Sequence, residues 1–136
     1  MSVVIDASAV LAILLDERGA DVAAAASRGA LLSAVNAIEV FQRFAREPKG
    51  VEAIEGELRM LEIAIVPFDA VQARIAADLK SRVGKKDSLA DRACLALSIH
   101  TGRPCVTAEH RWAELDVGVD VRLIREWRDR EAAPRT

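Results

Sequence analysis

The sequence predicts an α/β fold, a three-layer α/β/α sandwich around a mostly parallel sheet of about five short strands. Short aliphatic runs recur along the chain, and longer segments with helical periodicity lie between them. Strands that alternate with helices in this way form parallel sheets with helices on both faces. The chain has 136 residues, of which 51% are hydrophobic, so it is large and apolar enough for one domain with its own core.

The expected elements follow one another without interruption from the first residues. The strand candidates are short, mostly aliphatic runs at 3–5, 30–33, 63–66, 104–106 and 121–124. The helical patterns lie at 8–16, 19–28, 35–47, 50–61, 69–83, 88–101, 109–115 and 125–131. The first strand is β-branched throughout, which is typical of a central strand buried on both faces. No repeat or flexible linker appears, so we expect one domain over 1–131 and a short flexible tail over 132–136.

Composition narrows the possible functions. The formal net charge of −2 argues against a protein that coats nucleic acid, although an enzyme with a local basic patch remains possible. Aromatic residues make up 4% of the chain, which disfavours a base-stacking platform. There is no long apolar segment and no signal peptide, so we expect a cytoplasmic protein without a membrane partner. Cys94 and Cys105 lack metal or redox spacing and are expected to be reduced core residues.

Asp6 is the most informative single residue, because it directly follows the apolar first strand. In a parallel sheet, the carboxyl end of a central strand opens into the crevice where α/β folds bind their ligands. A carboxylate placed there is costly unless a metal ion or a basic group neutralises it. Asp6 is therefore expected to be functional.

Three further acids are expected at the same rim of the sheet. Glu39 lies just after the second strand, Asp91 at the start of an apolar helix, and Glu109 right after the fourth strand. Each also has a structural interpretation. Glu39 could face solvent, Asp91 could cap its helix through the pattern Ser88-x-x-Asp91, and Glu109 could be a first-turn acid.

Grouped carboxylates repel one another, so such a cluster makes physical sense around cations. Oxygen ligands favour Mg²⁺ or Mn²⁺ over Zn²⁺, and His100 and His110 are too isolated to form a zinc site. Ions held by carboxylates can clamp a phosphate, activate a water and stabilise a leaving oxygen. The predicted chemistry is phosphodiester hydrolysis.

Four segments together resemble a known family. They are Val4–Ala9, Ser33–Val40, Leu89–Leu97 and Val106–Trp112, and the similarity runs over nearly the whole chain. In this order they resemble a PIN domain, specifically a VapC-type toxin of bacterial toxin–antitoxin systems. The resemblance implies a Mg²⁺-dependent endoribonuclease that cleaves cellular RNA, accepts Mn²⁺, and is inhibited by a cognate VapB-like antitoxin.

The resemblance also implies roles for individual residues. The catalytic acids would be Asp6, Glu39, Asp91 and Glu109, with Asp6 and Asp91 as the firmest metal ligands. Three polar residues would stand just behind these ligands and at times contact the ion, namely Ser8, Asn36 and Thr107. The family usually has Asp where this chain has Glu109, so Asp116 is the alternative fourth acid. Asp87 is interpreted as a helix N-cap.

Basic residues near these acids are candidate contacts for RNA phosphates. The candidates are Arg43, Arg46, Lys49, Arg82, Lys85, Lys86 and Arg92. Their alternative interpretation is an ordinary solvated helix end. The apolar surface of the helices at 8–16 and 35–47 exceeds what one sheet face needs, which is consistent with a homodimer seam or a groove for an antitoxin helix.

Two other functions remain open at this point. A phosphohydrolase with Asp6 as nucleophile would need a second acid two residues later, where this chain has Ser8. A non-catalytic PIN-like module that binds RNA or protein is the other alternative, and the substitution at Glu109 favours it.

Overall fold

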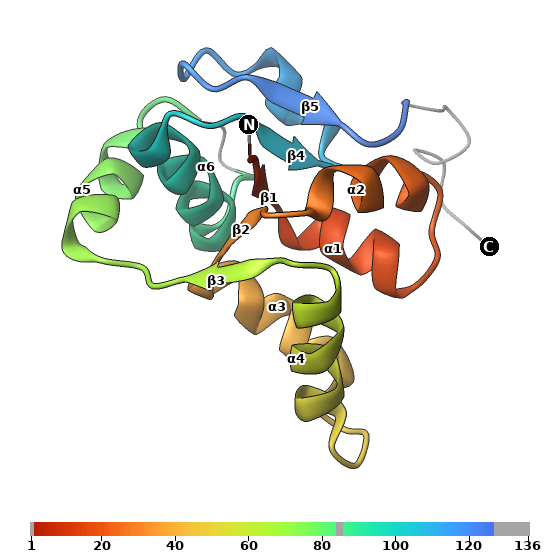
Figure 1. Ribbon diagram of the computed structural model, residues 1–136. Helices are drawn as coiled ribbons and strands as arrows, with labels where there is room; N and C mark the ends of the chain where they lie inside the picture. The colour runs from red at the N-terminus through yellow and green to blue at the C-terminus, as the bar shows by residue number, and fades with distance from the viewer. Residues whose placement is uncertain (1, 84–85, 127–136) are drawn as a thin grey trace.

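The computed structural model describes residues 2–83 and 86–126 and confirms the α/β/α sandwich (Figure 1). Its sheet has five strands in the order β3-β2-β1-β4-β5, and every pair is parallel. The strands are β1 (Val4–Ile5), β2 (Leu31–Ser33), β3 (Ala64–Val66), β4 (Cys105–Thr107) and β5 (Val121–Leu123). The first strand is central, as its β-branched sequence predicted.

Six α-helices and one 3₁₀ helix connect these strands. The α-helices are α1 (Ala7–Leu14), α2 (Ala20–Ser27), α3 (Ala34–Phe44), α4 (Gly50–Met60), α5 (Ala70–Leu79) and α6 (Leu89–Thr101). The 3₁₀ helix is η1 (His110–Glu114), where the sequence predicted a short helix. None of the helices in the described part of the chain is long and apolar enough to cross a membrane.

The alternation of side chains along the strands divides the core into two layers. Ile5, Leu32 and Val106 pack with residues of α1 to α4 on one face of the sheet. On the other face, Val4 and Cys105 pack with residues of α5 and α6 and with the fully buried Trp112. This two-sided burial explains why the inner strands β1, β2 and β4 are mostly apolar, whereas the edge strands β3 and β5 are more exposed.

The two cysteines belong to the second of these layers. Cys94 of α6 and Cys105 of β4 are buried free thiols whose sulfur atoms lie 3.5 Å apart. The prediction that both cysteines are core residues is confirmed.

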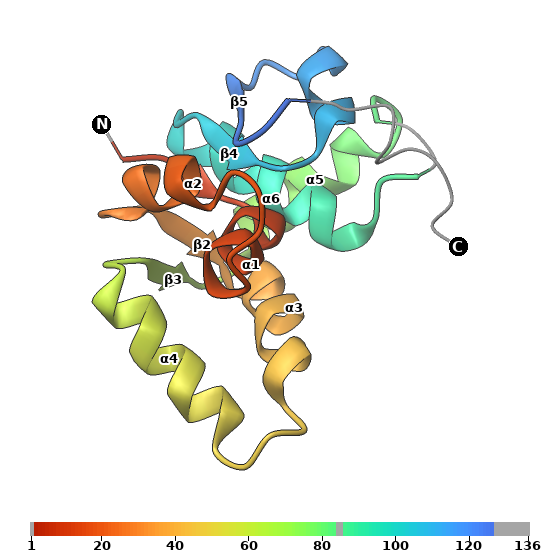
Figure 2. The same ribbon diagram turned by 90° about the vertical axis from the view of Figure 1, so that its right-hand side faces the viewer.

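Helices α3 and α4 form an antiparallel pair that extends away from the sheet (Figure 2). The turn between them depends on Gly50, because a Cβ atom at this position would lie 2.0 Å from the carbonyl oxygen of Phe44. Pro48 lies within this turn, and helices usually end before a proline. The helix expected at 35–47 ends earlier still, at Phe44.

Two other expected boundaries need comment. The helix expected over 69–83 ends at Leu79, although Val83 still packs against the second core layer and so continues the apolar periodicity. Of the helix expected at 125–131, residues 125 and 126 are not helical, and the remainder lies outside the described residues, as does the expected tail at 132–136.

Candidate functional site

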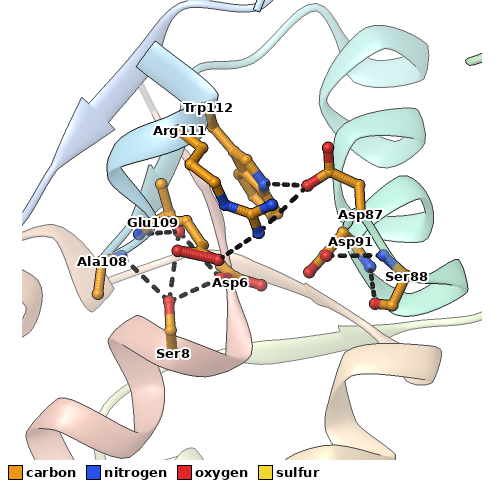
Figure 3. Close-up of polar contacts among 10 residues, drawn as sticks. Asp6, Ser8, Asp87, Ser88, Asp91, Ala108, Glu109, Arg111 and Trp112 are labelled. Carbon is orange, nitrogen blue, oxygen red and sulfur yellow. Dashed lines mark hydrogen bonds and ion pairs between the residues drawn. The ribbon is translucent and has the colours of Figure 1, made fainter. Parts of the chain in front are cut away.

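Asp6 lies at the junction of β1 and α1, where its side chain is held by two hydroxyl groups. The residue is 4% exposed. Ser8 Oγ donates a hydrogen bond of 2.6 Å to Asp6 Oδ2, and Thr107 Oγ1 donates one of 2.9 Å to the same oxygen. These contacts bring together the N-terminus of α1 and the end of β4, which are about a hundred residues apart in the sequence (Figure 3).

Each hydroxyl is itself oriented by a backbone N–H group of the segment after β4. The Ala108 N–H donates to Ser8 Oγ at 3.0 Å, and the Glu109 N–H donates to Thr107 Oγ1 at 3.0 Å. Since these N–H groups occupy acceptor sites on the hydroxyls, the hydroxyl protons point to Asp6. The network fixes the Asp6 carboxylate and the backbone that carries Glu109 as one unit.

Among the described residues, Asp6 is buried against hydroxyl groups, and no basic side chain contacts its carboxylate. Burial raises the pKa of its carboxyl above the ordinary value, and the charge of Asp91 raises it further. The hydroxyls of Ser8 and Thr107 lower the pKa, but their effect is smaller than that of burial. The ionised carboxylate is therefore costly in the ion-free protein, and a cation would lower that cost.

A second junction joins α3 to α6 and brings Glu39 toward Asp91. Asn36 is fully buried, and its Nδ2 donates a 3.0 Å hydrogen bond to the carbonyl oxygen of Ala90. Its Oδ1 is buried and has no hydrogen-bond partner within the described part of the chain. An unpaired buried amide oxygen is unusual and requires an explanation such as a water or an ion.

Glu39 itself lies on the exposed side of α3, but the charges of other acids still affect its carboxyl. Partial burial raises the pKa of its carboxyl, and the charges of Asp6 and Asp91 raise it further. Both Asp6 and Asp91 therefore act electrostatically on Glu39, as acids at one rim of a sheet should.

Asp91 caps its own helix. Ser88 is the N-cap of α6, its Oγ accepts the Asp91 N–H at 3.1 Å, and Asp91 Oδ2 accepts the Ser88 N–H at 2.8 Å. This is the capping box that the sequence pattern suggested. Burial raises the pKa of Asp91, and the charges of Asp87 and Glu109 add to this effect. The Asp91 carboxylate thus belongs both to the helix cap and to the group formed by Asp6, Glu39, Asp91 and Glu109, which we call the acid cluster.

Glu109 is paired with an arginine two residues along the chain. Arg111 donates a 2.9 Å hydrogen bond to Glu109 Oε2, and the same guanidinium lies 3.5 Å from Asp87 Oδ1 (Figure 3). The buried indole of Trp112 also donates to Asp87 Oδ1, at 3.2 Å. Asp87 therefore anchors η1 to the segment before α6. Its interpretation as an N-cap was wrong, because Ser88 has that role.

The donor set fits a hard divalent cation in its chemistry. It offers carboxylate oxygens and the Oδ1 of Asn36, which are ligands that hard cations prefer. Within residues 2–83 and 86–126, however, no three His, Cys, Asp or Glu side chains lie close enough to share one ion. Two of the acids are turned to other partners, since Asp91 caps α6 and Glu109 pairs with Arg111.

The other predicted residues lie at varying positions around this rim. Arg43, Arg46 and Lys86 are exposed, whereas Lys85 lies outside the described residues. The guanidinium of Arg92 donates to the carbonyl oxygen of Ala76 in α5. Asp116 is exposed, and it is not among the charges that shift the pKa values of Asp6, Glu39 or Asp91. Glu109, by contrast, acts on Asp91, which favours it as the fourth acid.

Sequence reasoning missed the contacts of Asp87 and Arg111. Arg111 lies inside the segment Val106–Trp112, but its position two residues after Glu109 gave no sign of an ion pair. The only available signal was a buried-type residue, Trp112, whose indole N–H needs an acceptor. Asp87 provides that acceptor from a distance of 25 residues along the chain.

The chain is similar to known structures, although not to curated sequences. Among curated proteins, no significant match to this sequence was found. Several solved structures are similar in fold. A toxin–antitoxin complex from Klebsiella pneumoniae has a TM-score of 0.75 and 19% identity, covering 93% of this chain and 100% of that chain. DNA-bound VapBC from Salmonella typhimurium has a TM-score of 0.70 and 11% identity, covering 92% and 99%. FitAcB from Neisseria gonorrhoeae has a TM-score of 0.65 and 22% identity, covering 88% and 95%.

At these identities the structural likeness establishes the fold alone. The family of the chain is established by its sequence, through a match to a family model. The model of the PIN domain matches residues 3–118, which include all four predicted acids and the hydroxyl network around Asp6. The chain belongs to the PIN domain family.

Proposed function

We propose that this protein is a Mg²⁺-dependent endoribonuclease that acts as the toxin of a toxin–antitoxin pair. The observation that carries the proposal is Asp6, a buried carboxylate fixed by Ser8 and Thr107 at the carboxyl end of the central strand. Burial and the charge of Asp91 raise the pKa of its carboxyl, so a cation at this place would favour the ionised form. Similarity in fold to proteins described as toxin–antitoxin complexes supports the biological context.

In this proposal the four acids have different roles. Asp6 and Asp91 would hold the ion, and Glu39 and Glu109 would complete the site or hold bound water. Ser8 and Thr107 keep the Asp6 carboxylate in one orientation, and Asn36 joins the helices that carry Glu39 and Asp91. When bound, a Mg²⁺ or Mn²⁺ ion supplies activation of a water and stabilisation of the leaving oxygen.

RNA would reach the rim along exposed cations. Arg43 and Arg46 lie at the end of α3 beyond Glu39, and Lys86 precedes α6. Such residues contact phosphates and position the strand without reading its sequence. Arg92 is a weaker candidate, because its guanidinium already bonds the Ala76 carbonyl.

An antitoxin would have a suitable groove between α1 and the pair of α3 and α4. The groove is lined by residues of these helices, of the turn between α3 and α4, and of the turn after α4, and two acids lie among its apolar residues. The lining residues are Ile13, Leu14, Phe44, Glu47, Ala53, Ile54, Glu57 and Leu61. An amphipathic helix with basic residues along its edge matches this pattern. The homodimer expected from the sequence remains a prediction.

The nuclease is tested with purified protein and a labelled RNA that contains single-stranded loops. Cleavage should require Mg²⁺ or Mn²⁺, stop with EDTA, and be absent from the Asp6→Asn variant. Inducible expression should arrest growth and create new RNA 5′ ends, whereas Asp6→Asn should do neither. Equal cleavage in EDTA would remove the metal-dependent mechanism.

One observation favours the alternative of a non-catalytic PIN-like module. In the described residues the acids are not assembled around a common point, and Glu109 is neutralised by Arg111. If the protein is such a module, its wild-type form and the Asp6→Asn variant should bind RNA or a protein partner with the same affinity. Filter binding of RNA with both proteins separates the two functions, provided that the cleavage assay is run on the same preparations.

A further inference from the structure

Arg111 brings a positive charge into the group of acids. Its guanidinium donates to Glu109 Oε2 at 2.9 Å and lies 3.5 Å from Asp87 Oδ1. The charges of Glu109, Asp87 and Asp91 all stabilise the guanidinium. One cation therefore faces acids from two parts of the chain, η1 and the start of α6 (Figure 3).

The position of this guanidinium is fixed more firmly than that of a surface ion pair. The Asp87 side chain is 3% exposed and also accepts the indole N–H of Trp112, which is fully buried. Arg111 and Trp112 are adjacent in sequence and reach the same oxygen of Asp87. Side-chain disorder, which weakens exposed ion pairs, is therefore reduced on the Asp87 side.

A second ion pair in the same chain provides the comparison. Arg122 pairs with Asp120 at 3.2 Å, and the separation along the chain is again two residues. Both of these side chains are more than half exposed. The pair lies beside Gly102, at the C-terminal end of α6, whereas Asp91 lies at the N-terminal end of the same helix. The two pairs differ chiefly in their surroundings.

We propose that Arg111 is a built-in counter-ion of the acid cluster, which holds the Glu109 carboxylate in the ion-free protein and competes with the divalent cation for it. This inference rests on the proposed function, since it assumes a cation site at these acids. Asp87 keeps the guanidinium beside Glu109. A divalent ion that uses Glu109 must displace Arg111 or share the carboxylate with it, and it meets the repulsion of the guanidinium in either case.

The proposal accounts for two features of the rim. Glu109 is turned to Arg111, and no three acids of the described residues are gathered at one point. It also gives the extra length of Glu109 a role, because the side chain reaches Arg111 of η1. Arg111 is thus a positioning residue for Glu109 and is not placed among the groups that touch substrate.

The test measures binding of Mn²⁺ to the full chain without RNA, by electron paramagnetic resonance or calorimetry. Removing the competing charge in Arg111→Gln should lower the Mn²⁺ dissociation constant by about threefold, the scale of a half-exposed charge interaction. Arg122→Gln is the matched control, because it removes the same charge from a pair of the same spacing, and its affinity should stay at the wild-type value. Combining Glu109→Gln with Arg111→Gln should abolish the gain.

Thermal unfolding provides a second readout. In EDTA, Arg111→Gln should melt at a lower temperature than wild type, because the acids lose their counter-ion. With saturating Mn²⁺ the difference should shrink. If Arg111→Gln does not fold, Arg111→Met, which keeps an unbranched stem, is measured in its place.

The outcomes are distinct. If wild type binds Mn²⁺ in a manner that depends on Asp6, and neither Arg111 variant binds it more tightly, the counter-ion role is wrong while the metal site stands. A weaker affinity in Arg111→Gln would show instead that the arginine orients Glu109 for the ion. If Asp6→Asn binds Mn²⁺ as tightly as wild type, the proposed metal site fails and this inference fails with it.

Discussion

At the scale of single residues, Asp6 shows how a fold can keep an unfavourable group in place. Its carboxylate is buried and lies near Asp91, yet Ser8 and Thr107 hold it through one oxygen. Each hydroxyl is in turn oriented by a backbone N–H group. The surrounding structure therefore fixes the orientation of a charge that it does not neutralise, which is typical of functional sites.

The first prediction concerns the stability of Asp6→Asn in metal-free buffer. Because burial raises the folded-state pKa of Asp6 above its unfolded value of about 3.8, the ionised side chain disfavours the folded state at neutral pH. The favourable contribution of this group is complete below the unfolded pKa and is lost as pH rises through the folded pKa. Asn keeps an oxygen that accepts both hydroxyls, so we expect stabilisation on the order of 1 kcal/mol at pH 7.

Urea unfolding in EDTA at several pH values measures this effect. The advantage of Asp6→Asn over wild type should shrink as pH falls toward 4 and vanish below that. Ser8→Ala provides the control, because it removes a hydroxyl and leaves the charge, and it should be less stable than wild type at pH 7. A variant Asp6→Asn that is less stable at every pH would contradict the electrostatic account.

The second prediction concerns the fourth acid. Glu109 contributes to the raised pKa of Asp91, whereas Asp116 is not among the charges that shift it. Glu109→Gln should therefore lower the rate of RNA cleavage by about tenfold or more, equivalent to about 1.4 kcal/mol of transition-state stabilisation. Glu109→Asp should retain activity, and Asp116→Asn should resemble wild type. An inactive Asp116→Asn beside an unaffected Glu109→Gln would reverse the assignment.

Asp6, Asp91 and Glu109 could be placed at one edge of the sheet from the sequence, because each follows a strand or opens a helix. Glu39 lies instead in the middle of α3. Ser8 and Thr107 were predicted as supporting residues through the family resemblance, and the structure places both on Asp6. The bond between Trp112 and Asp87 could not be predicted. It joins η1 to the segment before α6, 25 residues apart in the sequence, and no periodic pattern encodes such a contact.

At the scale of elements, helix ends depend on local chemistry more than on apolar periodicity. Helix α6 begins with the capping box of Ser88 and Asp91, and that beginning was visible in the sequence. Helix α5 ends at Leu79 although Val83 continues its apolar stripe into the core. Apolar periodicity indicates which residues are buried. A buried residue just beyond the end of a helix fits the same periodicity, so the pattern alone does not locate that end.

The third prediction concerns two glycines of α4. A Cβ atom at Gly50 would lie 2.0 Å from the Phe44 carbonyl oxygen, whereas one at Gly56 would meet only the end of the Arg59 side chain, at 3.9 Å. Gly50→Ala must therefore open the turn between α3 and α4 and should destabilise the fold by about 1–3 kcal/mol. Gly56→Ala should stabilise it by about 0.5–1 kcal/mol, because alanine favours a helix interior.

Urea unfolding of both variants checks the opposite signs. Mn²⁺ affinity should be unchanged in Gly56→Ala. Phe44 and Ile54 line the apolar groove beside this turn, so Gly50→Ala should also weaken binding of a helical partner, if the groove is its site. Equal effects of the two substitutions would mean that the turn adjusts without strain.

At the scale of the whole molecule, the order of the strands brings the residues of the candidate site together. With β1 between β2 and β4, residues near positions 6, 36 and 107 come to one edge of the sheet. The fold class could be predicted because strands and helices alternate throughout the chain. The partner could not be predicted from the residues alone, since an apolar helix face is equally suited to a core, a second copy or a foreign helix.

The last prediction follows from this convergence of acids. A cation that binds the folded rim but not the unfolded chain stabilises the protein, by about 2.7 kcal/mol at a concentration one hundred times its dissociation constant. For a chain of this size such a gain corresponds to a rise in melting temperature of about 8 °C. Wild-type protein should therefore melt higher in Mg²⁺ or Mn²⁺ than in EDTA, and the increment should be largely lost in Asp6→Asn. Asp120→Asn, which removes an exposed acid of the Arg122 ion pair, should keep the increment. If Asp6→Asn and Asp120→Asn respond to the ions as wild type does, the stabilisation is a general salt effect, and the carboxyl edge of this sheet is not where the cation binds.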